Sequence, residues 1–191
     1  HQITELYFKL SLHEFKQVAE HPNLTVEFFT ARVKRINAYF NALVTSFEVM
    51  VNGMEKEQFL KFRMSLLPAS GFQSGQYRMI EICATEFSRL IDKTKREALA
   101  DASVEEQFEN IYWKFGATEL SSGKQTLTLK QFIAKYGPRL VALIKEKEQT
   151  NFSVLYQKLR DKGQDVSILE EELKKLDLFV NVEWPLAHYK S

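Results

Sequence analysis

Histidine is the residue type in this sequence best suited to chemistry near neutral pH, because its imidazole titrates there and also binds metal ions. His188 lies in the stretch EWPLAHYKS, where Pro185 suits the first position of a helix and would place His188 one turn further on. His1 shares a helix face with Glu5 and Phe8 at helical spacing. Each of these two histidines is either a chemical group or a structural residue, and their spacing alone leaves both roles open.

The sequence around the other two histidines does not match the commonest metal or nucleotide sites. His13 falls on the predicted first helix and His21 precedes a proline in a loop, so both are expected to have structural or surface roles. The sequence has neither a pair of histidines at i and i+4 nor a glycine-rich phosphate loop. These are the usual sequence signatures of zinc and nucleotide sites, and nothing here indicates either chemistry.

A second candidate is the stretch FRMSLLPASGFQSGQYRMIE, residues 62–81, in a chain with few glycines and prolines. Pro68 disfavours helical geometry before it, and Ser70 followed by Gln73 fits a capping box at the start of a new helix. Such a start suits an anion, and Arg63 adds a fork-shaped donor matched to carboxylates. The alternative is a purely structural corner between two helices.

The elements that must position these residues are helical. An apolar stripe with steps of three and four predicts one long helix over 26–50, ended by Asn52 and Gly53. The first helix is predicted to carry Ile3, Leu6, Leu10 and Phe15 on one side. Other helices are predicted over about 73–91, 104–115, 126–136, 140–147 and 168–178, with a break at Gly137 and Pro138. We therefore expect an all-α fold, a single helical domain over 1–191 that reads as truncated at both ends.

Composition narrows the class of protein. A net charge of +1, with both signs mixed along the chain, predicts no nucleic-acid partner and no attraction to an anionic membrane. No apolar run approaches the length of about 20 residues that spans a bilayer. The single cysteine, Cys83, excludes an internal disulfide and favours a reducing compartment, so a soluble cytoplasmic protein is expected.

Three stretches together carry a specific family resemblance. HQITELYFKLSLHE, FRMSLLPASGFQSGQYRMIE and EWPLAHYKS closely resemble tryptophan 2,3-dioxygenases, helical haem enzymes that open the indole ring of L-tryptophan. The resemblance implies haem b with its iron as cofactor, L-tryptophan and O₂ as substrates, N-formylkynurenine as product, and a homotetramer.

The resemblance also implies roles for particular residues. His1 would be the catalytic distal histidine beside the indole N–H, and His188 the proximal histidine that ligates iron. Phe59 and Phe62 would form walls of the substrate pocket, and Arg63 would bind the substrate carboxylate. The implied haem contacts are Leu66, Ser70, Gly71 and Tyr77, the last of them near a propionate. General chemistry agrees with these roles, because arginine recognises carboxylates in two-point fashion and glycine permits close approach to a flat macrocycle.

Two alternatives stay open beside the dioxygenase. One is a haem enzyme of the same fold that acts on another aromatic substrate. The other is a helical interaction protein that binds no haem. A Soret band would separate the second alternative from both enzymes, and kynurenine formation would separate the enzymes from each other.

Overall fold

The computed structural model describes residues 2–53, 55, 57, 74–115 and 126–190, apart from the side chains of 50, 51 and 190. All the regular secondary-structure elements in these ranges are helices. Their one β-type contact is an isolated bridge between Ile91 and Ile111, with no strand among them. The prediction of an all-α fold is therefore confirmed.

The chain divides into two compact units. The first comprises residues 1–80 and 156–191, and the second comprises residues 81–155. The single catalytic domain expected from the sequence stays a prediction. None of the described helices combines the length and apolarity that crossing a membrane requires.

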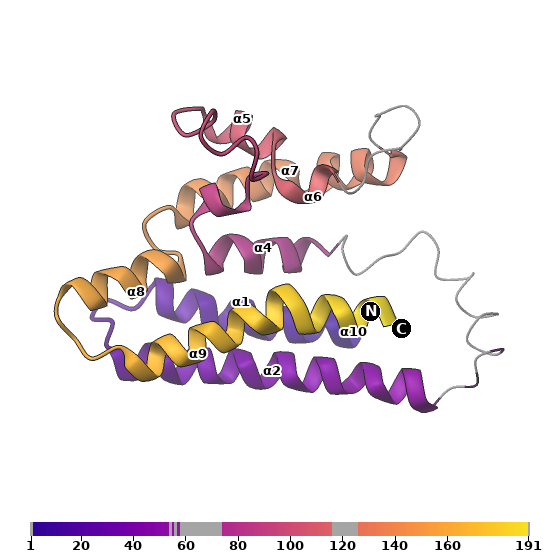
Figure 1. Cartoon of the computed structure of the whole chain (residues 1–191), viewed down its shortest axis with the longest axis horizontal. Coiled ribbons are helices and arrows are strands. Elements are labelled where there is room, and N and C mark those ends of the chain that lie inside the picture. The colour runs from indigo at the N-terminus through magenta and orange to yellow at the C-terminus, as the bar shows by residue number, and fades with distance from the viewer. Residues whose placement is uncertain (1, 54, 56, 58–73, 116–125, 191) are drawn as a thin grey trace. The chain divides into compact units, whose positions relative to one another are not determined.

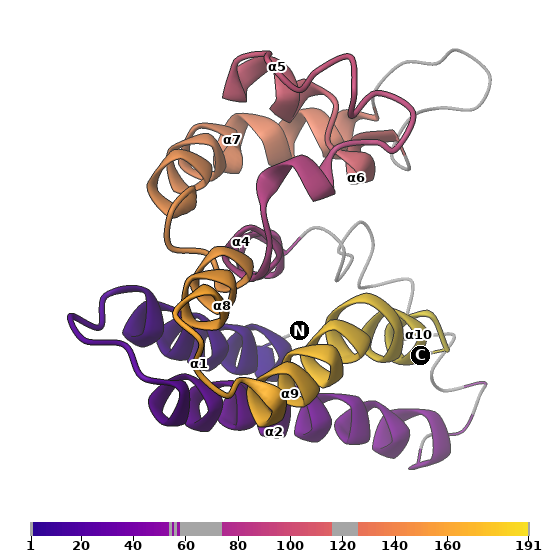
Figure 2. The same ribbon diagram turned by 60° about the vertical axis from the view of Figure 1, so that its left-hand side comes forward.

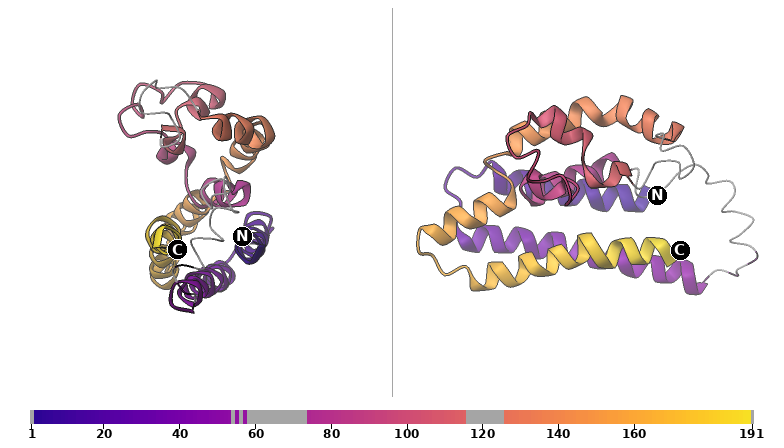
Figure 3. Two further views of the ribbon diagram at one scale, coloured as in Figure 1. Left: turned by 90° about the vertical axis from the view of Figure 1, so that its right-hand side faces the viewer. Right: turned by 45° about the horizontal axis from the view of Figure 1, so that its top comes forward.

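Three long helical runs build the first unit (Figure 1). Helix α1 (Gln2–Ala19) and helix α2 (Val26–Gly53) form an antiparallel hairpin. Helix α9 (Ser167–Leu178), a π-helical turn η3 (Phe179–Glu183) and helix α10 (Trp184–Lys190) follow one another without a break. Figures 2 and 3 show this yellow run lying along α2. The N-terminal end of α1 and the C-terminal end of α10 consequently lie at the same end of the unit.

The long helix predicted over 26–50 is confirmed as α2, and its apolar stripe forms the core of the first unit. The buried stripe consists of Phe29, Val33, Ile36, Phe40, Leu43 and Phe47. A stripe of this width on one face gives a helix two neighbours to pack against. Here the neighbours are α1 on one side and the run from α9 to α10 on the other.

The predicted apolar face of α1 is wrong. Phe15 is buried, whereas Ile3, Leu6 and Leu10 are 61%, 56% and 37% exposed. At 3.6 residues per turn, Phe15 falls on the side of the helix away from the other three. The buried face combines Phe8, Phe15 and Val18 with the small or polar Thr4, Ser11 and Glu14, so counting apolar residues alone selects the wrong side.

The expected helix start at Pro185 is also wrong. Pro185 is the second residue of α10, and the helical run passes through it from Ser167 to Lys190. Just before the proline the helix widens, and the Trp184 N–H bonds to the carbonyl of Phe179, five residues back. Irregular turns of this kind are common next to a proline within a helix, and the helical run continues through Pro185 here.

Shorter helices build the second unit around α7 (Leu127–Lys147). Helix α4 (Gly75–Ala84) enters this unit and α8 (Phe152–Asp161) leaves it. Between them lie a 3₁₀ turn η2 (Phe87–Leu90), α5 (Val104–Glu109) and α6 (Tyr112–Phe115). The predicted helices over 73–91 and 104–115 are thus shorter than expected, because each is interrupted by a turn.

The predicted break at Gly137 and Pro138 does not occur, and α7 continues through both residues. A proline removes one backbone hydrogen bond, but packing on both sides can hold the helix together. The buried face of α7 runs from Leu129 and Phe132 on one side of the proline to Leu140 and Ile144 on the other. Thr126 caps the start, its hydroxyl accepting the Leu129 N–H at 3.2 Å.

Candidate functional site

The structure describes two of the residues predicted for a haem and substrate site, Tyr77 and His188. The other predicted site residues lie outside the described residues: His1, Phe59, Phe62, Arg63, Leu66, Ser70 and Gly71. The expected capping box of Ser70 and Gln73 also lies outside them. Both described residues belong to the first unit.

His188 lies on α10 against an aromatic wall. Its imidazole stacks on the ring of Trp184, with centroids 5.2 Å apart and an interplanar angle of 28°. The ring of Phe47, from α2, meets the imidazole edge-on at 6.0 Å. Trp184 and His188 are four residues apart on one helix, a spacing that places two side chains on the same face. The helix and its neighbour α2 together fix the direction of the imidazole.

Burial lowers the pKa of His188 below the ordinary value of histidine, because the aromatic surroundings disfavour the charged imidazolium. The imidazole is half-buried. A lowered pKa keeps the ring neutral at physiological pH, and only a neutral ring nitrogen has a lone pair for a metal ion. The electrostatics of this position therefore suit a metal ligand.

Tyr77 is buried in the same aromatic cluster, on α4. Its ring lies 5.5 Å from Phe8 and 6.3 Å from Trp184 between centroids, and the residue is 2% exposed. The Tyr77 hydroxyl donates a hydrogen bond of 2.8 Å to the carbonyl of Val180 in the π-helical turn. The start of α4 is fixed by Ser74, whose hydroxyl accepts the Tyr77 N–H at 3.1 Å. Trp184 thus contacts both predicted site residues.

The position of His188 would suit a protein ligand to haem iron. The porphyrin itself supplies most of the iron ligands, so a single neutral imidazole would be enough to attach the group to the protein. The buried rings of Trp184 and Phe47 form an apolar backing behind the half-buried imidazole of His188. Within the described ranges, no group of three or more His, Cys, Asp or Glu side chains is arranged to hold a metal ion.

Sequence reasoning missed the aromatic residues that surround the two predicted ones. Trp184 is 2% exposed at the centre of the cluster, and Phe47 and Phe8 pack on it at 5.1 and 5.4 Å between centroids. The spacing of four between Trp184 and His188 could have identified the stacked pair once the region was taken as continuous helix. The expected helix start at Pro185 obscured that signal.

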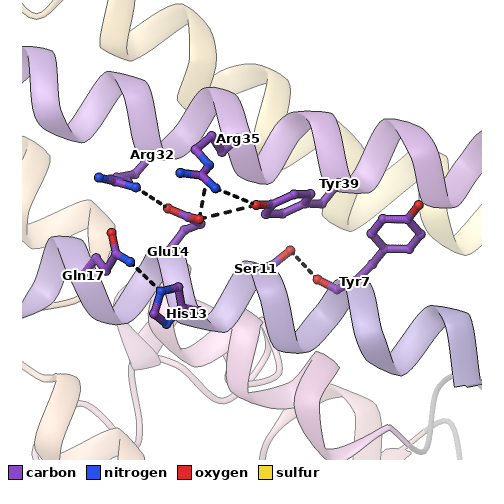
Figure 4. A network of polar contacts seen from close by, with 8 residues as sticks. All are labelled: Tyr7, Ser11, His13, Glu14, Gln17, Arg32, Arg35 and Tyr39. Atoms are coloured by element: carbon purple, nitrogen blue, oxygen red, sulfur yellow. Dashed lines mark hydrogen bonds and ion pairs between the residues drawn. The ribbon is translucent and has the colours of Figure 1, made fainter.

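A buried ionic network joins α1 to α2 elsewhere in the first unit (Figure 4). The carboxylate of Glu14, whose side chain is 2% exposed, pairs with Arg32 at 3.1 Å and Arg35 at 3.3 Å. Tyr39 lies in the same network, accepting from Arg35 and donating to Glu14. All these side chains are used in pairing the two helices. We assign this network to structure.

A hollow of about 330 Å³ lies in the second unit, at the junction of η2, α5 and the end of α7. Its wall includes Lys145 and Lys147. Both lysines are paired with glutamates, Lys145 with Glu105 at 2.5 Å and Lys147 with Glu146 at 2.7 Å. Each of the two lysines is therefore already paired with a carboxylate.

Comparison with known families decides which family the chain represents. The family model of tryptophan 2,3-dioxygenase matches residues 1–161. The chain belongs to the tryptophan 2,3-dioxygenase family. His188 lies beyond the matched residues. No solved structure matches the chain.

Individual tryptophan 2,3-dioxygenases match shorter stretches. The enzyme from Ruegeria sp. (strain TM1040) is 42% identical over 85 residues, which cover 42% of this chain and 29% of the relative. The enzyme from Bacillus anthracis is 39% identical over 85 residues, with the same coverage of 42% and 29%. The enzyme from Sorangium cellulosum (strain So ce56) is 36% identical over 88 residues, covering 43% and 21%. The matched stretches thus span less than a third of the curated relatives.

Proposed function

We propose that the protein is a haem-dependent dioxygenase that inserts both atoms of O₂ across the indole C2–C3 bond of L-tryptophan and yields N-formylkynurenine. The observation that carries the proposal is the match to the tryptophan 2,3-dioxygenase family over residues 1–161. The reaction is balanced without an external reductant, because both oxygen atoms of one O₂ molecule enter the product. We expect the enzyme to act in the cytoplasm.

His188 is proposed as the iron ligand. Its stacked, half-buried position and lowered pKa support the neutral ligand form. When bound, haem supplies the activation of O₂ that no protein side chain provides. The chain's own contribution on this side is to hold the imidazole in one orientation between Trp184 and Phe47.

The substrate side is proposed from residue chemistry and the family resemblance. Arg63 would hold the tryptophan carboxylate through two parallel hydrogen bonds. Phe59 and Phe62 would pack on the indole, His1 would face its N–H, and Leu66 would line the pocket on the haem side. These residues would orient the substrate and exclude water.

The haem edge is proposed to contact Ser70 and Gly71, with Tyr77 near a propionate. The single hydroxyl proton of Tyr77 is donated to Val180. A link from Tyr77 to a propionate would therefore need a bridging water that donates to the carboxylate.

Two measurements on the purified protein test the proposal. A Soret band with stoichiometric haem is expected, and its absence after haem reconstitution would favour the interaction protein. Formation of N-formylkynurenine from L-tryptophan and O₂ is expected to exceed turnover of other indoles. Preferential turnover of another aromatic compound would favour the second haem enzyme and overturn the substrate assignment.

We further propose a homotetramer. The exposed Ile3, Leu6 and Leu10 recur at steps of three and four on α1 and form an apolar stripe that a neighbouring subunit can cover. Size-exclusion chromatography with light scattering at micromolar concentration is expected to give four chains per particle. A monomer under these conditions would refute the assembly and leave the haem assignment unaffected.

A further inference from the structure

The π-helical turn that precedes His188 leaves one carbonyl without its regular helical donor. In this turn the Trp184 N–H bonds to Phe179, five residues back. Continuing the same pattern, the N–H of residue 185 would bond to the carbonyl of Val180. Residue 185 is proline and has no N–H. Val180 is 3% exposed, so bulk water has little access to supply a donor instead.

The Tyr77 hydroxyl occupies this position. It donates to the Val180 carbonyl at 2.8 Å, across a sequence separation of 103 residues. The same tyrosine packs its ring on Trp184, the residue directly before the proline. One side chain of α4 therefore holds both the carbonyl that the proline leaves open and the aromatic ring on which His188 stacks.

We propose that Tyr77 is a positioning residue for His188, acting through the Val180 carbonyl and the π-helical turn. The inference rests on the proposed role of His188 as iron ligand. The turn sets the rotation of α10 about its axis, because a π-type bond inserts an extra residue into the helical repeat. The hydrogen bond from Tyr77 stabilises that rotation, and the rotation determines where the His188 imidazole points. Tyr77 itself need not touch iron or substrate for this role.

Tyr77→Phe isolates the hydroxyl, since the phenyl ring preserves the packing on Phe8 and Trp184. We expect the haem-loaded variant to retain haem but to show a shifted iron–histidine stretching frequency in the ferrous resonance Raman spectrum. Haem transfer to apomyoglobin should be roughly twofold to tenfold faster, in line with the loss of one buried hydrogen bond. The matched control is Tyr156→Phe, which removes a hydroxyl that bonds the Glu170 carboxylate at 2.9 Å and leaves the π-helical turn intact. The control should change neither quantity.

Pro185→Ala provides a rescue that a general packing role for Tyr77 does not predict. Alanine restores the backbone N–H, so the Val180 carbonyl gains a backbone donor whether the turn stays π-helical or becomes α-helical. In the Pro185→Ala background, Tyr77→Phe should therefore have a much smaller effect on the stretching frequency and on haem release. If Tyr77→Phe alone does not fold, the double variant decides. Recovery of a folded haem protein supports the inference, and continued misfolding overturns it.

His188→Ala distinguishes failure of this inference from failure of the proposed function. If His188→Ala loses haem while Tyr77→Phe matches the wild type in both measurements, His188 remains the ligand and Tyr77 is not its positioning residue. If His188→Ala keeps haem with an unchanged spectrum, the ligand assignment fails and the inference fails with it. Equal effects of Tyr77→Phe with and without Pro185→Ala would also overturn the inference.

Discussion

The ring of Trp184 stacks on the imidazole of His188 at 5.2 Å between centroids, one helical turn apart on α10. The contact restricts the rotation of the imidazole, and the ring of Phe47 also packs against the imidazole, edge-on. A ligand held in this way loses little further freedom when it binds a metal. The packing of the first unit therefore fixes the direction of the His188 imidazole.

Mutation should distinguish the roles proposed for His1 and His188. His188→Ala is expected to abolish or strongly weaken haem retention, because the iron loses its protein bond, whereas His1→Ala should keep haem and lower turnover. Absorbance at the Soret band after gel filtration measures retention, and N-formylkynurenine formation measures turnover. His13→Ala, which removes an imidazole in contact with Gln17 on α1, is the control. Haem loss in His1→Ala together with a normal spectrum in His188→Ala would reverse the two roles.

Arg63→Lys tests recognition of the substrate carboxylate. Lysine keeps the charge but loses the fork, and the loss of a charge-assisted hydrogen bond costs about 1.5–3 kcal/mol. The KM for L-tryptophan should therefore rise roughly tenfold to a hundredfold. Steady-state kinetics give the value, and tryptamine, which lacks the carboxylate, should respond much less to the substitution. Unchanged kinetics with L-tryptophan would make Arg63 a structural residue.

Local features of the fold could be predicted from the sequence, whereas features that depend on long-range packing could not. The stripe from Phe29 to Phe47 predicts α2 well, because a single periodic face is recorded in local spacing. The continuity of α7 through Pro138 depends instead on packing at both ends of its buried face, from Leu129 to Ile144. Local rules for proline cannot include that contribution.

The candidate site likewise combines residues that local sequence predicts with long-range contacts that it does not. The motifs alone predict His188 and Tyr77 as site residues, since the stretches around them are distinctive, and their roles stay predictions. The hydrogen bond between Tyr77 and Val180 joins residues far apart in sequence, and the π-helical turn that makes it necessary has no simple sequence signal. The polar face of α1 was missed for a related reason. Glu14 is buried next to Arg32 and Arg35 of α2, which compensate its charge and lie far from it in the sequence.

Glu14→Gln tests whether that network stabilises the first unit. The substitution preserves the side-chain volume but leaves Arg32 and Arg35 without their carboxylate, so the free energy of unfolding should fall by about 1–3 kcal/mol. Urea unfolding followed by circular dichroism measures the change. Glu20→Gln is the control, because its pair with Lys16 is exposed and 3.8 Å long and should contribute below about 1 kcal/mol. Equal effects of the two variants would show that the buried network adds nothing specific.

Cys83 gives a pH-dependent test of burial in the second unit. Burial raises the pKa of its thiol to about 12, from an ordinary value of 9.0. Since the thiolate is the reactive form, labelling of the native protein by a disulfide reagent at pH 8 should be roughly a thousandfold slower than labelling of the unfolded chain. The chain has one cysteine, so the released chromophore reports this residue alone.

The raised pKa of Cys83 also predicts a dependence of stability on pH. The unfolded state loses its thiol proton first as the pH rises. The contribution of Cys83 to stability should therefore be complete below about pH 9 and be lost progressively between about pH 9 and 12. The difference in unfolding free energy between wild type and Cys83→Ala isolates this contribution from other groups that titrate in the same range. Rapid labelling of the native protein at pH 8, or a difference that does not change across this window, would contradict a buried thiol.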